Sequence, residues 1–486
     1  MAQEKHDPAD GTPFESVIGL EVHVQLKTKS KMFCGCENRF GADPNSLTCP
    51  VCLGHPGSLP AINRAAVEQA VRVGLACGAE IARFTKFDRK NYYYPDLPKN
   101  YQISQYDLPI STGGGIDIFV GEEKKRIGLT RVHLEEDAGK NIHVEGRPES
   151  LVDLNRAGVP LLEIVSRPDM RTPAEAGAYL RMLRQVLLYL GVSDCNMEEG
   201  SLRCDTNVSI RPRGSSHLET RTEIKNLNSF TNVENALGHE ITRQIKIRSS
   251  GKDVIQQTLL FDPERGETRV LRGKEEAHDY RYFPEPDLAP LHLDEKWIEG
   301  LRAALPELPA ARLERFRAAQ GLSHYHADVL VRDRDLADFF DECVKIHPRP
   351  QDIANWIVNA VKEETNQRGA TVREIGLSPE RLVDLVKAIE GGKVSKQKAR
   401  DVFKAMLGAP DPVEKIIASL GLGQVSDDAL LRKTVEAVIQ ANPGAVEDVR
   451  KGKKNSVNFL MGQVMRETKG QANPGVVTRL IQEVIG

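Results

Sequence analysis

The stretch Val17–Leu26, VIGLEVHVQL, alternates aliphatic and polar side chains along its whole length. A β-strand turns successive side chains to opposite faces, so this pattern predicts a half-buried strand. One face is aliphatic, and the other carries Glu21, His23 and Gln25. An acid beside an imidazole suits metal binding or acid–base chemistry, although an ordinary solvated strand face fits this stretch equally well.

Length and composition limit the classes of protein to which this chain can belong. A chain of 486 residues is too long for one core and should form two to four domains. A net charge of −3 gives no global attraction to nucleic acid, so any RNA contact must use local basic patches. No apolar run approaches the roughly 18 residues of a membrane span, and the polar start lacks a hydrophobic signal region, so a cytoplasmic location without membrane contact is expected. Eight cysteines in that compartment indicate thiols or metal ligands rather than disulfides.

Four of these cysteines form two close pairs, Cys34-Gly-Cys36 and Cys49-Pro-Val-Cys52. Two pairs joined by a short loop suit four thiolates that converge on one zinc ion. Such a site leaves no open coordination position, so the zinc would be structural. Incidental buried thiols are the alternative.

The segment from Lys86 to Pro109 contains five tyrosines, several basic residues and three prolines after position 94. Prolines interrupt regular structure, so the segment is predicted to be an ordered loop. Its aromatic and basic side chains could stack a base and hold phosphates, or they could pack the loop against the protein.

The order of predicted elements indicates an α+β fold. Strands alternate with helices beginning near Asn63, Thr172 and Asn228, which gives a cradle-like domain with an antiparallel sheet over residues 1–295. A helical domain over 296–410 and a small helical tail over 411–486 follow. Expected helices of the second domain span 309–319, 333–346, 352–366, 379–390 and 395–407.

Acidic residues recur in the α+β region, most of them at predicted strand ends. They are Glu21, Glu135, Glu136, Asp137, Glu198, Glu199, Asp205 and Glu223, joined by His23. Clustered carboxylates repel one another unless a cation lies among them, and Mg²⁺ holding ATP phosphates is a common reason for such a cluster. A histidine fits Mg²⁺ less well, and no phosphate-binding loop of the G-x-x-x-x-G-K-[ST] type is present.

A basic run lies near the end of the chain and precedes a predicted helix: Arg450, Lys451, Lys453 and Lys454. Such a run could contact RNA phosphates, or it could simply be solvated.

Several long motifs together resemble the B subunits of aspartyl/glutamyl-tRNA amidotransferases, and the resemblance covers essentially the whole chain. The motifs are VIGLEVHVQLKTKSKMFC, KFDRKNYYYPDLPKNYQISQ, HLEEDAGK, DLNRAGVPLLEIVSRPD, EEGSLRCDTNVS, EIKNLNSF and DYRYFPEPDL. The archaeal E subunits share many of them but carry a large insertion for which this chain has no room.

The resemblance implies a ligase that works within a complex. A glutaminase A subunit would release ammonia, and a small C subunit would join A to B. The B subunit would use ATP and Mg²⁺ to phosphorylate the side-chain carboxylate of Glu or Asp on tRNA(Gln) or tRNA(Asn), and ammonia would then displace phosphate. A non-discriminating aminoacyl-tRNA synthetase is a further possible partner.

The resemblance also implies roles for particular residues. The family's magnesium positions fall on Glu21, His23, Glu136, Asp205 and Glu223. Zinc is expected at the four cysteines, and the tail with its basic run is expected to bind tRNA. Which residues contact ATP stays open at this point, and the candidates are Lys90, Lys99 and Arg281.

The alternative function is a tRNA-binding scaffold subunit without catalytic residues. Loss of transamidation in Glu136→Ala, with glutaminase activity kept, would distinguish the catalytic subunit from the scaffold.

Overall fold

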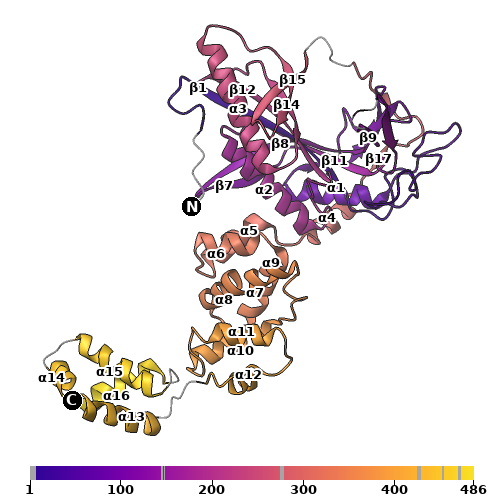
Figure 1. The fold of residues 1–486 in the computed structure, drawn as a ribbon. Coiled ribbons are helices and arrows are strands. Elements are labelled where there is room, and N and C mark those ends of the chain that lie inside the picture. Colours follow the sequence, from indigo (N-terminus) through magenta and orange to yellow (C-terminus); the bar gives the residue numbers. More distant parts are fainter. Residues whose placement is uncertain are drawn as a thin grey trace. The chain divides into compact units, whose positions relative to one another are not determined.

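A computed structural model of the chain describes residues 7–143, 146, 148–273, 279–423, 428–450, 454–468 and 472–485 (Figure 1). It divides into two compact units, residues 1–311 and 312–486, of which the first is α+β and the second helical. The first unit extends beyond the predicted domain boundary at residue 295, because helix α4 (Glu295–Ala303) packs on the core of this unit through Trp297 and Leu301. The predicted division into three domains stays a prediction. Within the described residues, no helix is both long and apolar enough to cross a bilayer.

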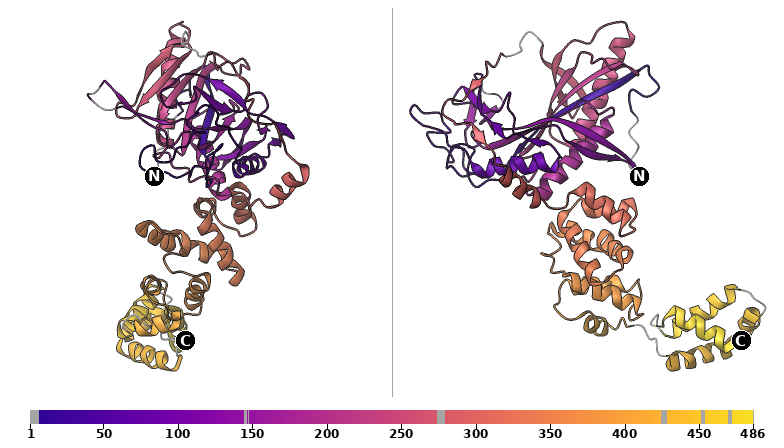
Figure 2. Two further views of the ribbon diagram at one scale, coloured as in Figure 1. Left: turned by 90° about the vertical axis from the view of Figure 1, so that its right-hand side faces the viewer. Right: turned by 180° about the vertical axis from the view of Figure 1, so that it is seen from behind.

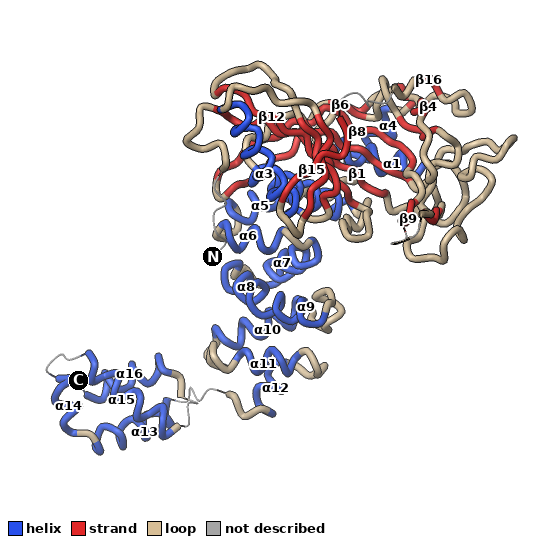
Figure 3. Tube along the Cα trace, turned by 45° about the horizontal axis from the view of Figure 1, so that its top comes forward, coloured by secondary structure: helices blue, strands red, loops and turns tan. Residues whose placement is uncertain are grey.

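Strand β1 (Phe14–Gln25) lies inside one large sheet, between β12 (Leu202–Pro212) and β11 (Pro160–Ser166), and pairs antiparallel with both (Figures 1 and 3). As predicted, its aliphatic side chains are buried, and Glu21, His23 and Gln25 are partly exposed on the other face.

The sheet continues on both sides of these three strands. Beyond β12 lie β13 (Thr222–Leu227), β14 (Gln257–Asp262) and β15 (Glu267–Gly273), and beyond β11 lie β8 (Glu123–Glu136), β5 (Tyr101–Ser104), β4 (Asp88–Asn91) and β16 (Phe283–Pro284). Neighbours along this path are antiparallel, except for the parallel pair of β13 and β14. The remaining short strands are β2 (Glu80–Ile81), β3 (Phe84–Thr85), β6 (Ser111–Thr112), β7 (Gly115–Val120), β9 (Lys140–His143), β10 (Ser150–Asp153) and β17 (Leu291–His292).

Three helices, α1 (Arg64–Ala76), α2 (Pro173–Leu190) and α3 (Phe230–Ser249), share one core with the aliphatic face of the sheet (Figure 2). The polar face of β1 is thereby left available for a site. Asn63 caps α1, as predicted, and Thr172 caps α2 through the Glu175 amide. The predicted start of α3 at Asn228 was wrong by two residues. The helix begins at Phe230, because the Ser229 hydroxyl caps it by accepting the hydrogen bond from the Asn232 amide.

The prediction of a loop without regular structure over residues 86–109 was wrong in part. Strands β4 and β5 lie within it and pair with each other, and β5 also pairs with β8. The prolines did not exclude strands here because two of them, Pro95 and Pro98, lie in the connection between β4 and β5.

The second unit is built of short helices, in keeping with the predicted helical C-terminal region. The predicted helix at 352–366 consists of α8 (Pro350–Trp356), a π-helical turn (Ile357–Val361) and α9 (Lys362–Arg368). The helix α6 (His324–Val331) was not predicted. The others are α5 (Pro309–Ala318), α6 (His324–Val331), α7 (Arg334–Ile346), α10 (Pro379–Glu390), α11 (Ala399–Met406), α12 (Val413–Ser419), α13 (Asp428–Ala441), α14 (Pro443–Arg450), α15 (Lys454–Glu467) and α16 (Pro474–Ile485).

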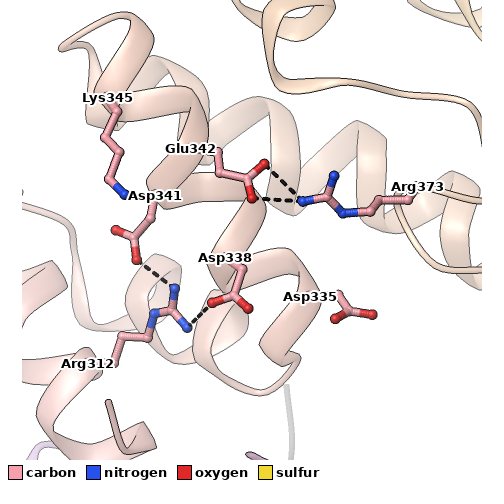
Figure 4. Close-up of a pocket in the computed structure, with 7 residues that line it drawn as sticks. All are labelled: Arg312, Asp335, Asp338, Asp341, Glu342, Lys345 and Arg373. Atoms are coloured by element: carbon pink, nitrogen blue, oxygen red, sulfur yellow. Dashed lines mark hydrogen bonds and ion pairs between the residues drawn. The ribbon is translucent and has the colours of Figure 1, made fainter. Parts of the chain in front are cut away.

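A buried arginine ties α5 to α7 (Figure 4). The side chain of Arg312 is 6% exposed, and its guanidinium lies 2.6 Å from Asp338 and 2.6 Å from Asp341. Arg315 also donates to Asp341, at 2.7 and 2.9 Å. Burial raises the pKa of Asp341, but the hydrogen bonds from Arg315 and Arg312 outweigh it and hold this pKa below its usual range.

Asp341→Asn should lower the free energy of unfolding of this unit by about 2 kcal/mol at pH 7, because it leaves Arg312 buried with one carboxylate fewer. Since the folded pKa is depressed, the contribution of Asp341 is complete above a pH of about 4 and is lost as the pH falls through the lower folded value. Urea titrations followed by Trp356 in a Trp297→Phe background measure this unit. The exposed Asp384→Asn on α10 should stay within about 0.5 kcal/mol of its parent; an equal loss in both variants would contradict the prediction.

Candidate functional site

The register of the sheet aligns polar side chains on one face of neighbouring strands. His23 on β1 lies opposite Glu163 on β11, and Glu163 lies opposite His133 on β8. On the other side of β1, Glu21 lies opposite Asp205 of β12. Directly opposite residues of antiparallel strands point to the same face, so the polar face of β1 continues across these strands.

The centre of this face is a group of two histidines and two glutamates, His23, His133, Glu135 and Glu163, which we call the histidine–glutamate centre. His23 Nε2 lies 3.2 Å from Glu163 Oε2 and 3.7 Å from Glu135 Oε1. His133 Nε2 lies 3.4 Å from Glu163 Oε2 and 3.8 Å from Glu135 Oε2. Ligand atoms of His23, Glu135 and Glu163 lie within 4.8 Å of one another, a spacing at which they could hold one metal ion.

Charge in this centre is balanced between the imidazoles and the carboxylates. Burial lowers the pKa of His133, but hydrogen bonds to Glu135 and Glu163 outweigh it and raise the pKa to about 9. Burial raises the pKa of Glu163, but hydrogen bonds from His133 and His23 hold it far below its usual range. Two ionised carboxylates in so buried a place require positive charge beside them, which protonated imidazoles or a bound cation can supply.

A second acidic group continues along the same face. Lys225 Nζ lies 2.6 Å from Asp205 and 3.1 Å from Glu223, and Asn207 donates to Glu21 at 2.9 Å. Burial and then the charges of Glu163 and Asp205 raise the pKa of Glu21. The pKa of Glu21 is therefore affected both by the histidine–glutamate centre and by this second group.

Four of the five predicted magnesium residues, Glu21, His23, Asp205 and Glu223, thus share the polar face, but Glu136 does not join them. His133 and Glu135, two residues apart on β8, point to the polar face. Glu136 is the next residue along the strand and therefore points to the opposite face. Its carboxylate forms a buried ion pair with Lys99 and accepts a hydrogen bond from the Ile103 amide at 3.0 Å.

Of the three predicted ATP contacts, Lys90 is the one whose pKa is raised by the charge of Glu135. Its ammonium lies 4.9 Å from the Tyr280 ring and 5.9 Å from the Tyr92 ring. Burial lowers its pKa, but the charge of Glu135 and neighbouring tyrosines outweigh burial and raise it, so the side chain is a cation. Arg281 is exposed and has a left-handed backbone, with a φ of 46°. The ammonium of Lys99 forms an ion pair with Glu136 instead.

Sequence reasoning missed Glu163 and His133. A signal for Glu163 was available, since it is the one charged residue in the strand Pro160–Ser166, PLLEIVS, of which all but one residue are buried. A charged group among apolar strand residues needs a partner. His133 and Glu135 are two residues apart, as Glu21 and His23 are, so each pair shares one face of its strand. The sequence does not show, however, that β8 and β1 both pair with β11.

The four predicted zinc cysteines converge in the structure. The sulfur atoms of Cys34, Cys36, Cys49 and Cys52 lie within 4.8 Å of one another. Cys52 Sγ accepts from the Cys49 amide at 3.2 Å, and the buried ammonium of Lys31 lies 3.7 Å from it. The hydrogen bond from Cys34 is the main cause that lowers the pKa of Cys52, to about 4. Four sulfur donors at this spacing fit a tetrahedral metal ion.

The predicted tRNA contacts lie mostly outside the described side chains. Arg450 is exposed at the end of α14. Lys451 and Lys453 lie outside the described residues, and Lys454 begins α15.

Comparisons with known proteins agree with the resemblance. The family model described as the GatB/GatE catalytic domain matches residues 16–299, more than half of the chain. The chain belongs to this family. A second model, described as a GatB domain, matches residues 338–485. The B subunit of the aspartyl/glutamyl-tRNA(Asn/Gln) amidotransferase of Moorella thermoacetica is 53% identical over 97% of this chain and 99% of its own length. The corresponding protein of Carboxydothermus hydrogenoformans is 51% identical over 97% of this chain and 98% of its own length, and that of Geobacter sulfurreducens is 52% identical over 97% and 99%.

Membership of this family gives the polar face a functional context. The catalytic-domain match includes every residue of the histidine–glutamate centre and all four cysteines, since it runs from residue 16 to residue 299. The second match begins within α7 and includes α8 to α16 of the helical unit.

Proposed function

We propose that this chain is the carboxylate-activating and tRNA-binding subunit of a glutamine-hydrolysing, tRNA-dependent amidotransferase. Its substrates would be Glu-tRNA(Gln), Asp-tRNA(Asn) or both, with ATP as the phosphoryl donor. The observation that carries the proposal is the alignment of His23, Glu163 and His133 across three strands, which gathers buried charge on one face of a family catalytic domain. The names of the relatives supply the reaction class.

The proposed reaction has two group transfers. A side-chain carboxylate oxygen of the tRNA-linked Glu or Asp bonds to the γ-phosphorus of ATP, the bond from this phosphorus to the bridging oxygen breaks, and ADP leaves. The lone pair of ammonia then forms a bond to the acyl carbon, the bond from this carbon to the phosphate oxygen breaks, and phosphate leaves. The nitrogen releases a proton and the amide is complete. A carboxylate needs this activation because its own oxygen is a poor leaving group.

His23, Glu135 and Glu163 would hold a divalent cation, with Glu135 in place of the predicted Glu136, whose carboxylate is bound to Lys99. A cation there supplies positive charge that offsets the charge of phosphate oxygens. We keep Mg²⁺ as the predicted ion; since an imidazole is among the ligands, Mn²⁺ should bind more tightly. The ammonium of Lys90, whose pKa is raised by the charge of Glu135, would orient a phosphate group.

The proposed partners follow from the relatives' names, which describe one subunit of a complex. We propose the glutaminase A subunit as the source of ammonia, the small C subunit as the link between A and B, and misacylated tRNA as the substrate. The deciding assay combines the three subunits with each misacylated tRNA, ATP and glutamine. Failure to form either amidated tRNA would contradict the proposal.

We propose structural zinc at Cys34, Cys36, Cys49 and Cys52, which we call the cysteine group. Purified wild-type chain should contain one zinc per chain, and Cys49→Ser should reduce this to less than about 0.1, because three thiolates and a hydroxyl hold Zn²⁺ far less tightly than four thiolates do. Elemental analysis measures the content. Cys343→Ser, which changes a thiol of the helical unit, should retain the zinc. A wild-type chain without zinc would refute this assignment.

A further inference from the structure

The loop that carries Cys49 and Cys52 contacts Lys99 through Gly54. Gly54, two residues after Cys52, has a φ of +69°, and a Cβ added there would overlap Lys99 Cγ and lie 3.2 Å from Lys99 Cα. The stem of Lys99 therefore lies flat on the backbone of the loop that carries two of the four cysteines. Gly57 in the same loop has a φ of +83° and open space at its Cβ position.

The head of Lys99 reaches Glu136 at the end of β8. The side chains of Lys99 and Glu136 are 9% and 4% exposed, and the Ile103 amide also donates to this carboxylate. Gln102 donates to the Glu136 carbonyl at 2.6 Å. A buried ion pair with further hydrogen bonds holds both partners in one geometry, because each charge would be costly to leave alone.

Glu136 adjoins Glu135 of the histidine–glutamate centre in the chain. Their side chains leave β8 on opposite faces, so the segment that fixes Glu136 also fixes the direction of Glu135. Ser104 pairs with Glu135 in the sheet and donates to its carboxylate at 3.2 Å. The ion pair thus anchors the strand end that aims Glu135 at His23.

A second route joins the same places. Gly158, with a φ of +85°, brings its backbone close to Cys52 and Glu136: an added Cβ would lie 3.3 Å from Cys52 Cβ and 3.8 Å from Glu136 Oε2. The buried ammonium of Lys31 lies between Cys52 Sγ and the Leu154 carbonyl, 3.5 Å from the latter. The cysteine group and the end of β8 are therefore parts of one packed region.

We propose that Lys99 and Glu136 are positioning residues that couple the cysteine group to the histidine–glutamate centre, so that an ordered, zinc-loaded cysteine group tightens cation binding at the centre. The inference rests on the proposed function, which places a divalent cation at His23, Glu135 and Glu163. It gives Lys99 and Glu136 a role through Glu135 rather than contact with ATP or magnesium.

The test compares Gly54→Ala with Gly57→Ala in the full-length, zinc-loaded chain. Both variants place alanine at a left-handed position, but only Gly54→Ala pushes on Lys99, so backbone strain is matched. Binding of Mn²⁺ is measured from the free-ion signal in electron paramagnetic resonance, with zinc content determined in parallel. Gly54→Ala should weaken Mn²⁺ binding about tenfold, as expected when support of a ligand is removed, and Gly57→Ala should match wild type.

A thermodynamic cycle isolates the coupling. Lys99→Met keeps the stem on Gly54 and removes the ammonium, and it should weaken Mn²⁺ binding about tenfold with one zinc retained. Stripping zinc before the titration should weaken binding in wild type by a similar factor and should have little further effect in Lys99→Met. Equal Mn²⁺ affinity in wild type, Gly54→Ala and Lys99→Met would overturn the coupling. Absence of Mn²⁺ binding in wild type would instead overturn the proposed cation site.

Discussion

Glu163→Gln in the assembled amidotransferase is expected to lower ATP-dependent amidation of misacylated tRNA about 10²- to 10³-fold, with glutaminase activity largely kept. Glu163 accepts from both His23 and His133, so the substitution removes the negative charge that the two imidazoles share. An amide keeps the size of the side chain but cannot balance a cation. Initial rates of Gln-tRNA and Asn-tRNA formation measure the effect.

The matched control is Glu122→Gln, at an exposed position between β7 and β8, which should leave amidation unchanged. This pair of variants also separates the catalytic subunit from the scaffold alternative. A scaffold would tolerate Glu163→Gln, because it needs no charge balance at the polar face. Wild-type amidation in Glu163→Gln would therefore remove the catalytic assignment while leaving tRNA binding open.

Removal of the tail should weaken tRNA binding about tenfold or more at physiological salt. Helix α12 packs on α10 and α11, so the truncation belongs after Gly423 rather than at the predicted boundary near 410. The helices that follow have a core of their own, built around Leu431, Leu460 and Leu480. Their removal should therefore spare the rest of the chain. Filter binding of tRNA measures the affinity, and the zinc content checks the remaining fold.

A charge variant tests the basic run within the same tail. Replacing Arg450, Lys451, Lys453 and Lys454 by alanine should weaken binding and make its salt dependence shallower, by roughly 0.7–0.9 in the log–log slope for each phosphate that is no longer neutralised. Unchanged tRNA affinity after truncation would show that the tail assignment is wrong. An unchanged slope with weaker binding would assign the phosphate-binding role to other residues of the tail.

Local sequence determined several of the elements and one of the two groups whose side chains could hold a metal ion. The alternation in Val17–Leu26 specified which face of β1 is buried, since strand geometry has a period of two residues. The caps at Asn63 and Thr172 were readable because a side-chain oxygen satisfies amides only two or three residues away. The two cysteine pairs were readable because their spacing allows all four sulfurs to meet within one short loop region.

Tertiary structure alone decided which carboxylates meet the histidines. Glu163 and His133 join His23 because β11 and β8 pair beside β1 in one register, and that register follows from the packing of apolar residues more than a hundred positions apart in sequence. The choice between Glu135 and Glu136 depended on the parity of β8 relative to its neighbours, since a shift of one residue exchanges the two faces. Alternation within a strand is a local property, whereas the partner of a strand is set by the whole core.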